Sequence, residues 1–329
     1  VLFMALWWAW SYTAWATGWI DPDRLPVVAL LAVLMVASLV MGASLLQSFD
    51  GRGAAFALAY VALGLLRNAF MVWAAGTRTP LGRGFTRLLG LGVLSGVLWI
   101  LGGELADAHA RLLVWAVAAL IDLMAPAIGH GGAATRAEAA EVSAAHLAER
   151  CQLLLMIAFG ESFLRLGEAW AAHRGTVGSD GAFVVGFLLV FAVWSVYFLH
   201  HAEAGERLIG EAGEAATSLA RSAYMYAHAM LVGGVIAMAV AIHRAIEAPA
   251  QAVTPAGAGL CIGGPVACVV GLALSKRWLG HGAHHRWPLF GALALGAVGL
   301  ATSFSTQLVE LVAVTVVAGV VAARAWASS

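Results

Sequence analysis

Four ionisable residues lie in one otherwise apolar segment, residues 146–162: His146, Glu149, Arg150 and Glu161. Only one of the ten residues between Arg150 and Glu161 is strongly polar. In a helix Glu149 and Glu161 are separated by about 18 Å, which is less than the roughly 30 Å thickness of a bilayer's hydrocarbon core. If the segment spans a membrane, at least one of these groups lies at membrane depth, where ionisable side chains usually serve a function.

The chemistry of these residue types is proton exchange or anion binding. All four lie near one face of the helix that we expect over residues 143–168. A buried carboxylate either pairs with a cation or takes up a proton, and histidine changes charge near neutral pH. Arg150, or Arg67 from another apolar segment, could hold an anionic group. The same residues could instead pair only to hold helices together.

Further polar side chains inside apolar segments extend this candidate site: Asp122, Arg67, Tyr224 and His228. We expect three arginines to neutralise the three buried acids. The arginines are Arg67, Arg150 and Arg221, and the acids are Asp122, Glu149 and Glu161.

Aromatic residues are concentrated in the first apolar segment. Trp8, Tyr12 and Trp15 are spaced as neighbours on one face of a helix. This pattern is typical of packing and of anchoring at a membrane interface. It is also compatible with an aromatic wall for an apolar or cationic ligand.

A metal site is a weaker interpretation. His146 and Glu149 could both ligate from one helix face, but bundle di-iron sites use the reverse order, Glu-x-x-His, twice, with two more carboxylates. We therefore predict no metal. Nucleotide-binding, nucleophile-elbow and haem-attachment motifs are missing from the sequence, and the identity of any cofactor stays open.

The composition predicts the elements that position these residues. Of the 329 residues, 62% are hydrophobic and 11% are charged, and the mean hydropathy is +0.88. Soluble domains carry about 25% charged residues, so we predict an all-α, polytopic transmembrane bundle. We expect one integral membrane domain over residues 1–329 without a soluble domain. The ten or eleven expected spans are 1–19, 26–47, 54–75, 85–103, 108–128, 143–168, 181–200, 218–242, 254–274, 288–304 and 306–326.

The distribution of charge predicts orientation and partners. Loops after odd-numbered spans hold nine Lys or Arg residues and loops after even-numbered spans hold four, which predicts that the odd-numbered loops and the C-terminus are cytoplasmic. The formal net charge is zero, so no basic field indicates nucleic acid. The expected partners are the lipid bilayer and a small-molecule, proton or lipidic ligand. The sequence starts at Val1 without methionine, and we expect one more helix upstream.

The segment His146-Leu-Ala-Glu-Arg150, followed by Phe159-Gly-Glu-Ser162, resembles the bacterial low temperature requirement A (LtrA) family. The resemblance extends to Trp7-Trp-Ala-Trp10, Asp21-Pro-Asp-Arg24, Ile121-Asp-Leu-Met-Ala-Pro126 and Tyr224-Met-Tyr-Ala-His228. It covers the chain up to about residue 245, although Leu147 stands where the family favours Phe. The resemblance implies a multi-pass protein of the bacterial inner membrane and supplies no biochemical activity.

Three functions are compatible with these residues. The first is a proton-coupled transporter or carrier, in which the acids change protonation and the histidines relay protons. The second is an intramembrane acid–base enzyme acting on a lipid-like or isoprenoid substrate, with the aromatic face shielding that substrate. The third is a structural or sensory membrane protein. We expect the carrier.

Overall fold

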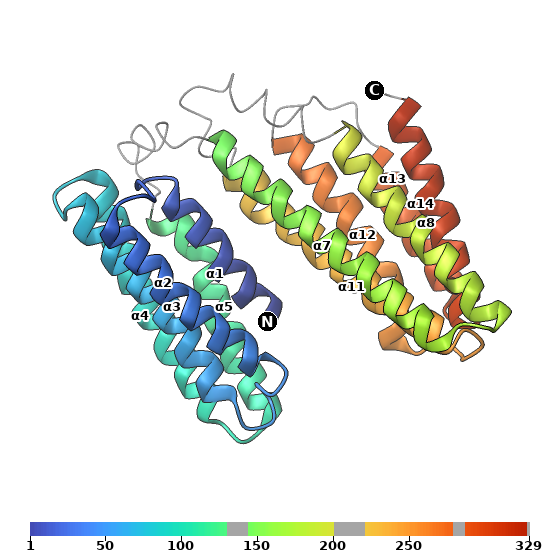
Figure 1. Cartoon of the computed structure of the whole chain (residues 1–329), viewed down its shortest axis with the longest axis horizontal. Coiled ribbons are helices and arrows are strands. Elements are labelled where there is room, and N and C mark those ends of the chain that lie inside the picture. Colours follow the sequence, from blue (N-terminus) through green and yellow to red (C-terminus); the bar gives the residue numbers. More distant parts are fainter. Residues whose placement is uncertain (130–143, 201–220, 279–286, 328–329) are drawn as a thin grey trace. The chain divides into compact units, whose positions relative to one another are not determined.

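A computed structural model describes residues 1–129, 144–200, 221–278 and 287–327 (Figure 1). These residues form eleven α-helices and one π-helix. The helices are α1 (Leu2–Thr17), α2 (Leu25–Leu45), α3 (Gly53–Ala75), α4 (Pro80–Glu104), α5 (Ala108–Gly129), α7 (Ala144–His173), α8 (Val177–His200), the π-helix η2 (Arg221–Ala227), α11 (His228–Glu247), α12 (Pro255–Trp278), α13 (Trp287–Thr302) and α14 (Gln307–Ala327).

The predicted polytopic helical bundle is confirmed. Within the described ranges, eight helices are long and apolar enough to cross a membrane, and α13 is a shorter apolar helix. Each of the eleven expected spans overlaps one α-helix, and the expected span 218–242 also includes the π-helix η2. Helices α1 and α7 are not among the eight that are long and apolar enough to cross a membrane. Apart from those of the first and last turns, the backbone polar groups of a helix are bonded within the segment, and for this reason apolar sequence in lipid adopts this form. The predicted single membrane domain remains a prediction.

The chain divides into two compact units, the N-terminal unit Val1–His146 and the C-terminal unit Leu147–Ser329. In the N-terminal unit, α3 packs between α2 and α4, α4 packs on α5, and α1 contacts α3 and α5. The backbones of α3 and α4 approach closely at Gly53 and Gly103, where a Cβ on Gly103 would lie 2.9 Å from the carbonyl oxygen of Gly53. Small residues permit such close approach between membrane helices.

Large aromatic side chains fill the core of the N-terminal unit. Phe56, Trp99 and Trp115 are fully buried. The ring centroids of Trp99 and Trp115 are 5.4 Å apart, and Trp115 donates its indole N–H to the backbone oxygen of Trp99 at 2.8 Å. This contact fixes α4 against α5 and thereby fixes the direction of the Trp99 ring.

In the C-terminal unit, α12 packs against α11 and α13, while α14 packs against α13 and α8. Gly234 of α11 and Gly264 of α12 allow close contact, since a Cβ on Gly234 would lie 2.6 Å from the carbonyl oxygen of Gly264. Helix α7 meets α8 through aromatic rings, including Trp170 and Phe183 with centroids 5.1 Å apart. The side chain of Trp170 also donates to Asp180 at 2.7 Å.

Candidate functional site

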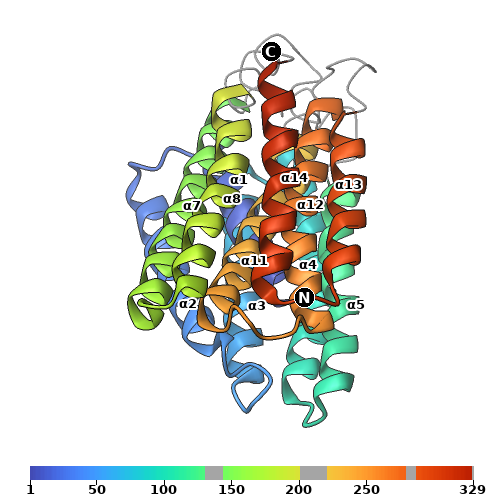
Figure 2. The same ribbon diagram turned by 90° about the vertical axis from the view of Figure 1, so that its right-hand side faces the viewer.

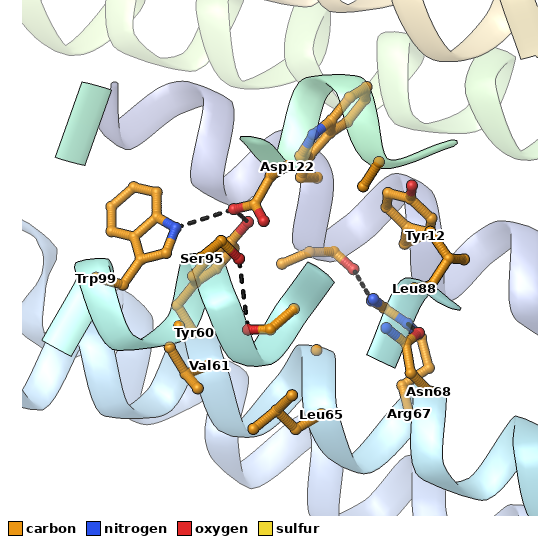
Figure 3. Close-up of a pocket in the computed structure, with 16 residues that line it drawn as sticks. Tyr12, Tyr60, Val61, Leu65, Arg67, Asn68, Leu88, Ser95, Trp99 and Asp122 are labelled. Atoms are coloured by element: carbon orange, nitrogen blue, oxygen red, sulfur yellow. Dashed lines mark hydrogen bonds between the residues drawn. The ribbon is translucent and has the colours of Figure 1, made fainter. Parts of the chain in front are cut away.

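A polar cavity lies inside the N-terminal unit, between helices α1, α3, α4 and α5 (Figure 3). Its volume is about 50 Å³. At roughly 10–15 Å³ for each water centre, this is room for a few waters or one small ion. All four helices bring polar atoms to it, so a charged group could be solvated here within an apolar bundle.

The acid of this cavity is Asp122 on α5. Its Oδ2 accepts a hydrogen bond from the Tyr60 hydroxyl at 2.8 Å and another from the Trp99 indole N–H at 2.9 Å. Both donors come from neighbouring helices, α3 and α4, and Ser95 lines the cavity beside them. Two donors on one oxygen hold the carboxyl group in a fixed orientation and help to stabilise its charged form.

The cation of this cavity is Arg67 on α3, which is 5% exposed. Its Nη1 donates to the Ala9 carbonyl at 3.5 Å and to the Thr13 hydroxyl at 3.4 Å, both on α1. Its Nε donates to the Asn68 side chain at 3.3 Å, and the guanidinium lies 5.0 Å from the centre of the Tyr12 ring. Helix α1 therefore supplies most of the environment that replaces water around this charge.

Asp122 and Arg67 share the cavity without pairing. In the described residues no nitrogen of Arg67 lies within 4 Å of an Asp122 oxygen, and Figure 3 shows the two groups on different sides of the lined space. Among those residues the Nη2 of Arg67 also donates no hydrogen bond. By contrast, the buried Arg111 donates to the carbonyl oxygens of Ser48 and Leu105. Arg111 thus bonds the backbone just beyond the ends of α2 and α4. Arg67, in contrast, lines a cavity and has N–H groups on Nη2 that could donate to a ligand there.

The candidate aromatic wall is divided between the cavity and the core. Trp8 and Tyr12 line the cavity, with Tyr12 against Arg67. Trp15 does not line it; its ring packs on Phe85 with centroids 6.1 Å apart. The cation that contacts this aromatic face is therefore Arg67, a residue of the chain itself, and not a bound ligand.

The expected burial of the ionisable residues on α7 is wrong. Glu149, Arg150 and Glu161 are exposed, because the buried face of this helix carries apolar residues such as Leu155 and Phe159. The expected pairing of Glu161 is also different. Its carboxylate contacts Arg165 of the next turn at 2.8 Å, and Arg165 contacts Glu168 at 3.2 Å.

The remaining two candidates lie in the C-terminal unit. His228 is fully buried, and its Nε2 is 2.7 Å from the hydroxyl of Tyr197 on α8. The ring of Tyr224 lies 4.8 Å from that of His228. Tyr224 belongs to η2, and π-helical turns inside helices are frequent at functional sites. The side chains of His146 and Arg221 lie outside the described part of the chain.

The structure adds Tyr60, Trp99 and Tyr197 to the residues that sequence reasoning singled out. Their sequence context is apolar and resembles that of packing aromatics, so only their hydroxyl and indole groups could have pointed to a role. Within the described helices no three His, Cys, Asp or Glu residues gather as they would around a metal ion. The absence of a metal, with His146 and Glu149 as weak candidate ligands, remains a prediction.

Membrane-length helices surrounding buried ionisable groups define a multi-pass α-helical membrane protein. The chain matches the family described as bacterial low temperature requirement A protein (LtrA) over residues 1–323, and it belongs to that family. It is also 32% identical, over 283 residues, to the uncharacterized protein RA0937 of Rhizobium meliloti (strain 1021). That alignment covers 84% of this chain and 68% of the relative. No solved structure matches the chain.

Proposed function

We propose that this protein is a proton-coupled carrier of a small anion, with the cavity of the N-terminal unit as its binding site. The observation that carries the proposal is that Asp122 and Arg67 line one cavity, bordered by α1 and by the membrane-length helices α3, α4 and α5, and do not form an ion pair. Ionisable side chains inside a membrane are costly and usually mark ion pathways or proton relays. If Asp122 and Arg67 formed a direct ion pair, each would neutralise the charge of the other, and no cavity would be needed between them.

Arg67 supplies the anion-binding group. Its guanidinium is held by the Ala9 carbonyl, Thr13 and Asn68, so little conformational freedom is lost when an anion arrives. The Nη2 donors and the full positive charge remain for the ligand. A cavity of about 50 Å³ limits that ligand to a few heavy atoms. This small size also argues against a lipid-like or isoprenoid substrate in this cavity.

Asp122 supplies the proton coupling. When ionised, it places a negative charge in the same cavity and repels an incoming anion; when protonated, it removes that repulsion. Binding of an anion therefore favours the protonated acid, and by reciprocity protonation raises the affinity for the anion. The hydrogen bonds from Tyr60 and Trp99 stabilise the ionised form when the anion is absent. Anion and proton consequently bind and leave together, as in a symporter.

Direct binding tests the proposal. Purified protein in weakly buffered detergent solution is titrated with chloride, nitrate, sulfate, phosphate and short carboxylates. Tryptophan fluorescence, to which Trp8 and Trp99 of the cavity wall contribute, reports binding, and a pH indicator reports proton uptake. We expect at least one anion to bind with uptake of up to one proton for each chain. Asp122→Asn should bind that anion without proton uptake, and Arg67→Gln should not bind it.

Two exposed charges provide matched controls, Glu161→Gln for the acid and Arg78→Gln for the arginine. Both should behave as the natural chain does. If no anion binds, or if Arg67→Gln binds as tightly as the natural chain, the anion proposal is wrong. If Asp122→Asn takes up the same number of protons, the coupling lies elsewhere.

The inner-membrane location and the cytoplasmic odd-numbered loops remain predictions, and thiol labelling from each side of oriented vesicles tests them.

A further inference from the structure

The C-terminal unit holds a second cavity of a different character. It lies between α8, α12, α13 and α14, and its volume is about 240 Å³. Alanine, valine, leucine and proline side chains form nearly all of its wall, for example Val193, Leu272 and Leu295. Apolar cavities of about 150 Å³ remain dry and bind molecules such as benzene. This one therefore suits a hydrocarbon chain and does not suit an ion.

Two cations lie at one end of this apolar cavity. Lys276, which is half-buried, stands in the last turn of α12, and Arg324 stands in the last turn of α14. Pro288, at the start of α13, also lines the cavity. The ends of α12 and α14 and the start of α13 lie at the same end of the bundle in Figure 2. The positive charges thus lie at one end of the cavity, here called its mouth, and the rest of its wall is apolar.

The length of α12 that lines the cavity matches one leaflet of a bilayer. Along α12 the wall runs from Pro265 to Lys276, and eleven residues of helix rise about 16 Å. Half of a roughly 30 Å hydrocarbon core is nearly the same length. A cation at the mouth consequently lies at headgroup depth when the deep end of the cavity lies near the bilayer centre.

We propose that this cavity binds one acyl chain of an anionic membrane phospholipid, with the lipid phosphate on Lys276 and Arg324. Charge complementarity selects the anionic headgroup, because basic pockets between transmembrane helices bind such headgroups. The predicted orientation places this mouth at the cytoplasmic leaflet. Since this site lies wholly in the C-terminal unit, it is independent of the anion cavity around Asp122 and Arg67.

Native mass spectrometry of the purified chain tests this site. The protein is titrated in detergent with phosphatidylglycerol, with phosphatidylcholine of the same acyl chains, and with sodium phosphate. We expect phosphatidylglycerol to bind most tightly and phosphate alone not to bind at this site. Each cation near a membrane surface contributes about 1 kcal/mol to attraction, which corresponds to about five-fold in affinity. Lys276→Gln should therefore weaken phosphatidylglycerol binding about five-fold, and Lys276→Gln with Arg324→Gln about thirty-fold.

Arg277 is the matched control, since it is the exposed neighbour of Lys276 in the same helical turn. Arg277→Gln should leave the preference for phosphatidylglycerol unchanged. Leu295→Trp, which fills the cavity, should abolish binding of both lipids; if this variant does not fold, Lys276→Gln with Arg324→Gln still decides. Equal phosphatidylglycerol affinity in the natural chain and that double variant would overturn the proposal. Competition by free phosphate at millimolar concentration would also overturn it, because the site would then bind phosphate without a lipid.

Discussion

The indole nitrogen of Trp99 lies 2.9 Å from the Oδ2 of Asp122, and the Trp99 ring itself is completely buried. A single side chain therefore belongs both to the aromatic core of the N-terminal unit and to the wall of its polar cavity. Because Trp115 bonds the backbone of Trp99 as well, the carboxyl group of Asp122 is positioned by the packing of α4 on α5. The candidate site and the stability of this unit are thereby coupled.

Trp99→Phe tests this coupling. The substitution removes a hydrogen bond to a carboxyl group and part of a buried ring, so we expect the free energy of unfolding to fall by about 2–4 kcal/mol. Unfolding in mixed detergent micelles, followed by circular dichroism, measures the change. Trp73→Phe is the control, because Trp73 is 69% exposed. A loss of stability no larger than that of the control would show that the contact with Asp122 contributes little.

The close contact between α11 and α12 predicts different effects for two adjacent glycines. A Cβ on Gly264 would lie 2.7 Å from Cγ of Met238 and 2.9 Å from the carbonyl oxygen of Gly234, whereas a Cβ on Gly263 would meet nothing within 4 Å. Gly264→Ala should therefore destabilise the protein by about 1–3 kcal/mol through overpacking. Gly263→Ala should be neutral or stabilising by up to about 1 kcal/mol. Thermal unfolding of the two purified variants measures the difference, and equal unfolding temperatures would contradict the close contact.

Tyr197→Phe removes the hydroxyl group that lies 2.7 Å from His228 Nε2. Loss of one partner from a buried polar group costs about 1–3 kcal/mol, so we expect a measurable loss of stability with the ring packing retained. Equilibrium unfolding gives the energy, and the imidazole nitrogen resonances of His228 should move. Tyr197→Leu, which also removes the ring, should be less stable still. Unchanged histidine resonances in Tyr197→Phe would argue against the hydrogen bond.

The exposed charges of α7 are expected to tolerate substitution. Arg150→Ala and Glu161→Gln should each change the free energy of unfolding by about 0.5 kcal/mol or less, because exposed charges and surface ion pairs contribute little. Expression level and unfolding in mixed micelles measure this. A loss of several kcal/mol in Arg150→Ala would instead support the buried ion pair that the sequence led us to expect.

The sequence was sufficient to predict the architecture, because a helix is the one form in which an apolar segment without a closed sheet can satisfy its backbone in lipid. It also identified Asp122, Arg67, Trp8 and Tyr12, which the structure brings to one cavity. Two of these are ionisable residues within apolar runs, which are rare enough to be recognised. A helix wheel gives the face on which a residue lies and does not give the neighbour that the face meets.

This limit explains the error on α7. Glu149, Arg150 and Glu161 lie near one helix face, and they are exposed while Leu155 and Phe159 pack inward. The local partner Arg165 could have been predicted from its spacing to Glu161 and Glu168, since residues three or four apart are neighbours on a helix. Tyr60 and Trp99 could not, because their hydrogen bonds to Asp122 join residues 62 and 23 positions apart.

The contacts of Arg67 with α1 have a consequence for biogenesis. Helix α3 carries this arginine within an apolar span, and an arginine at the centre of a helix costs about 2.5–3.5 kcal/mol during insertion by the translocon. Ala9, Tyr12 and Thr13 of α1 supply a carbonyl group, an aromatic face and a hydroxyl group to that charge. Helix α1 is synthesised before α3 and can receive α3 as it leaves the ribosome. The order of synthesis thus gives the arginine a polar host at the moment it enters the bilayer.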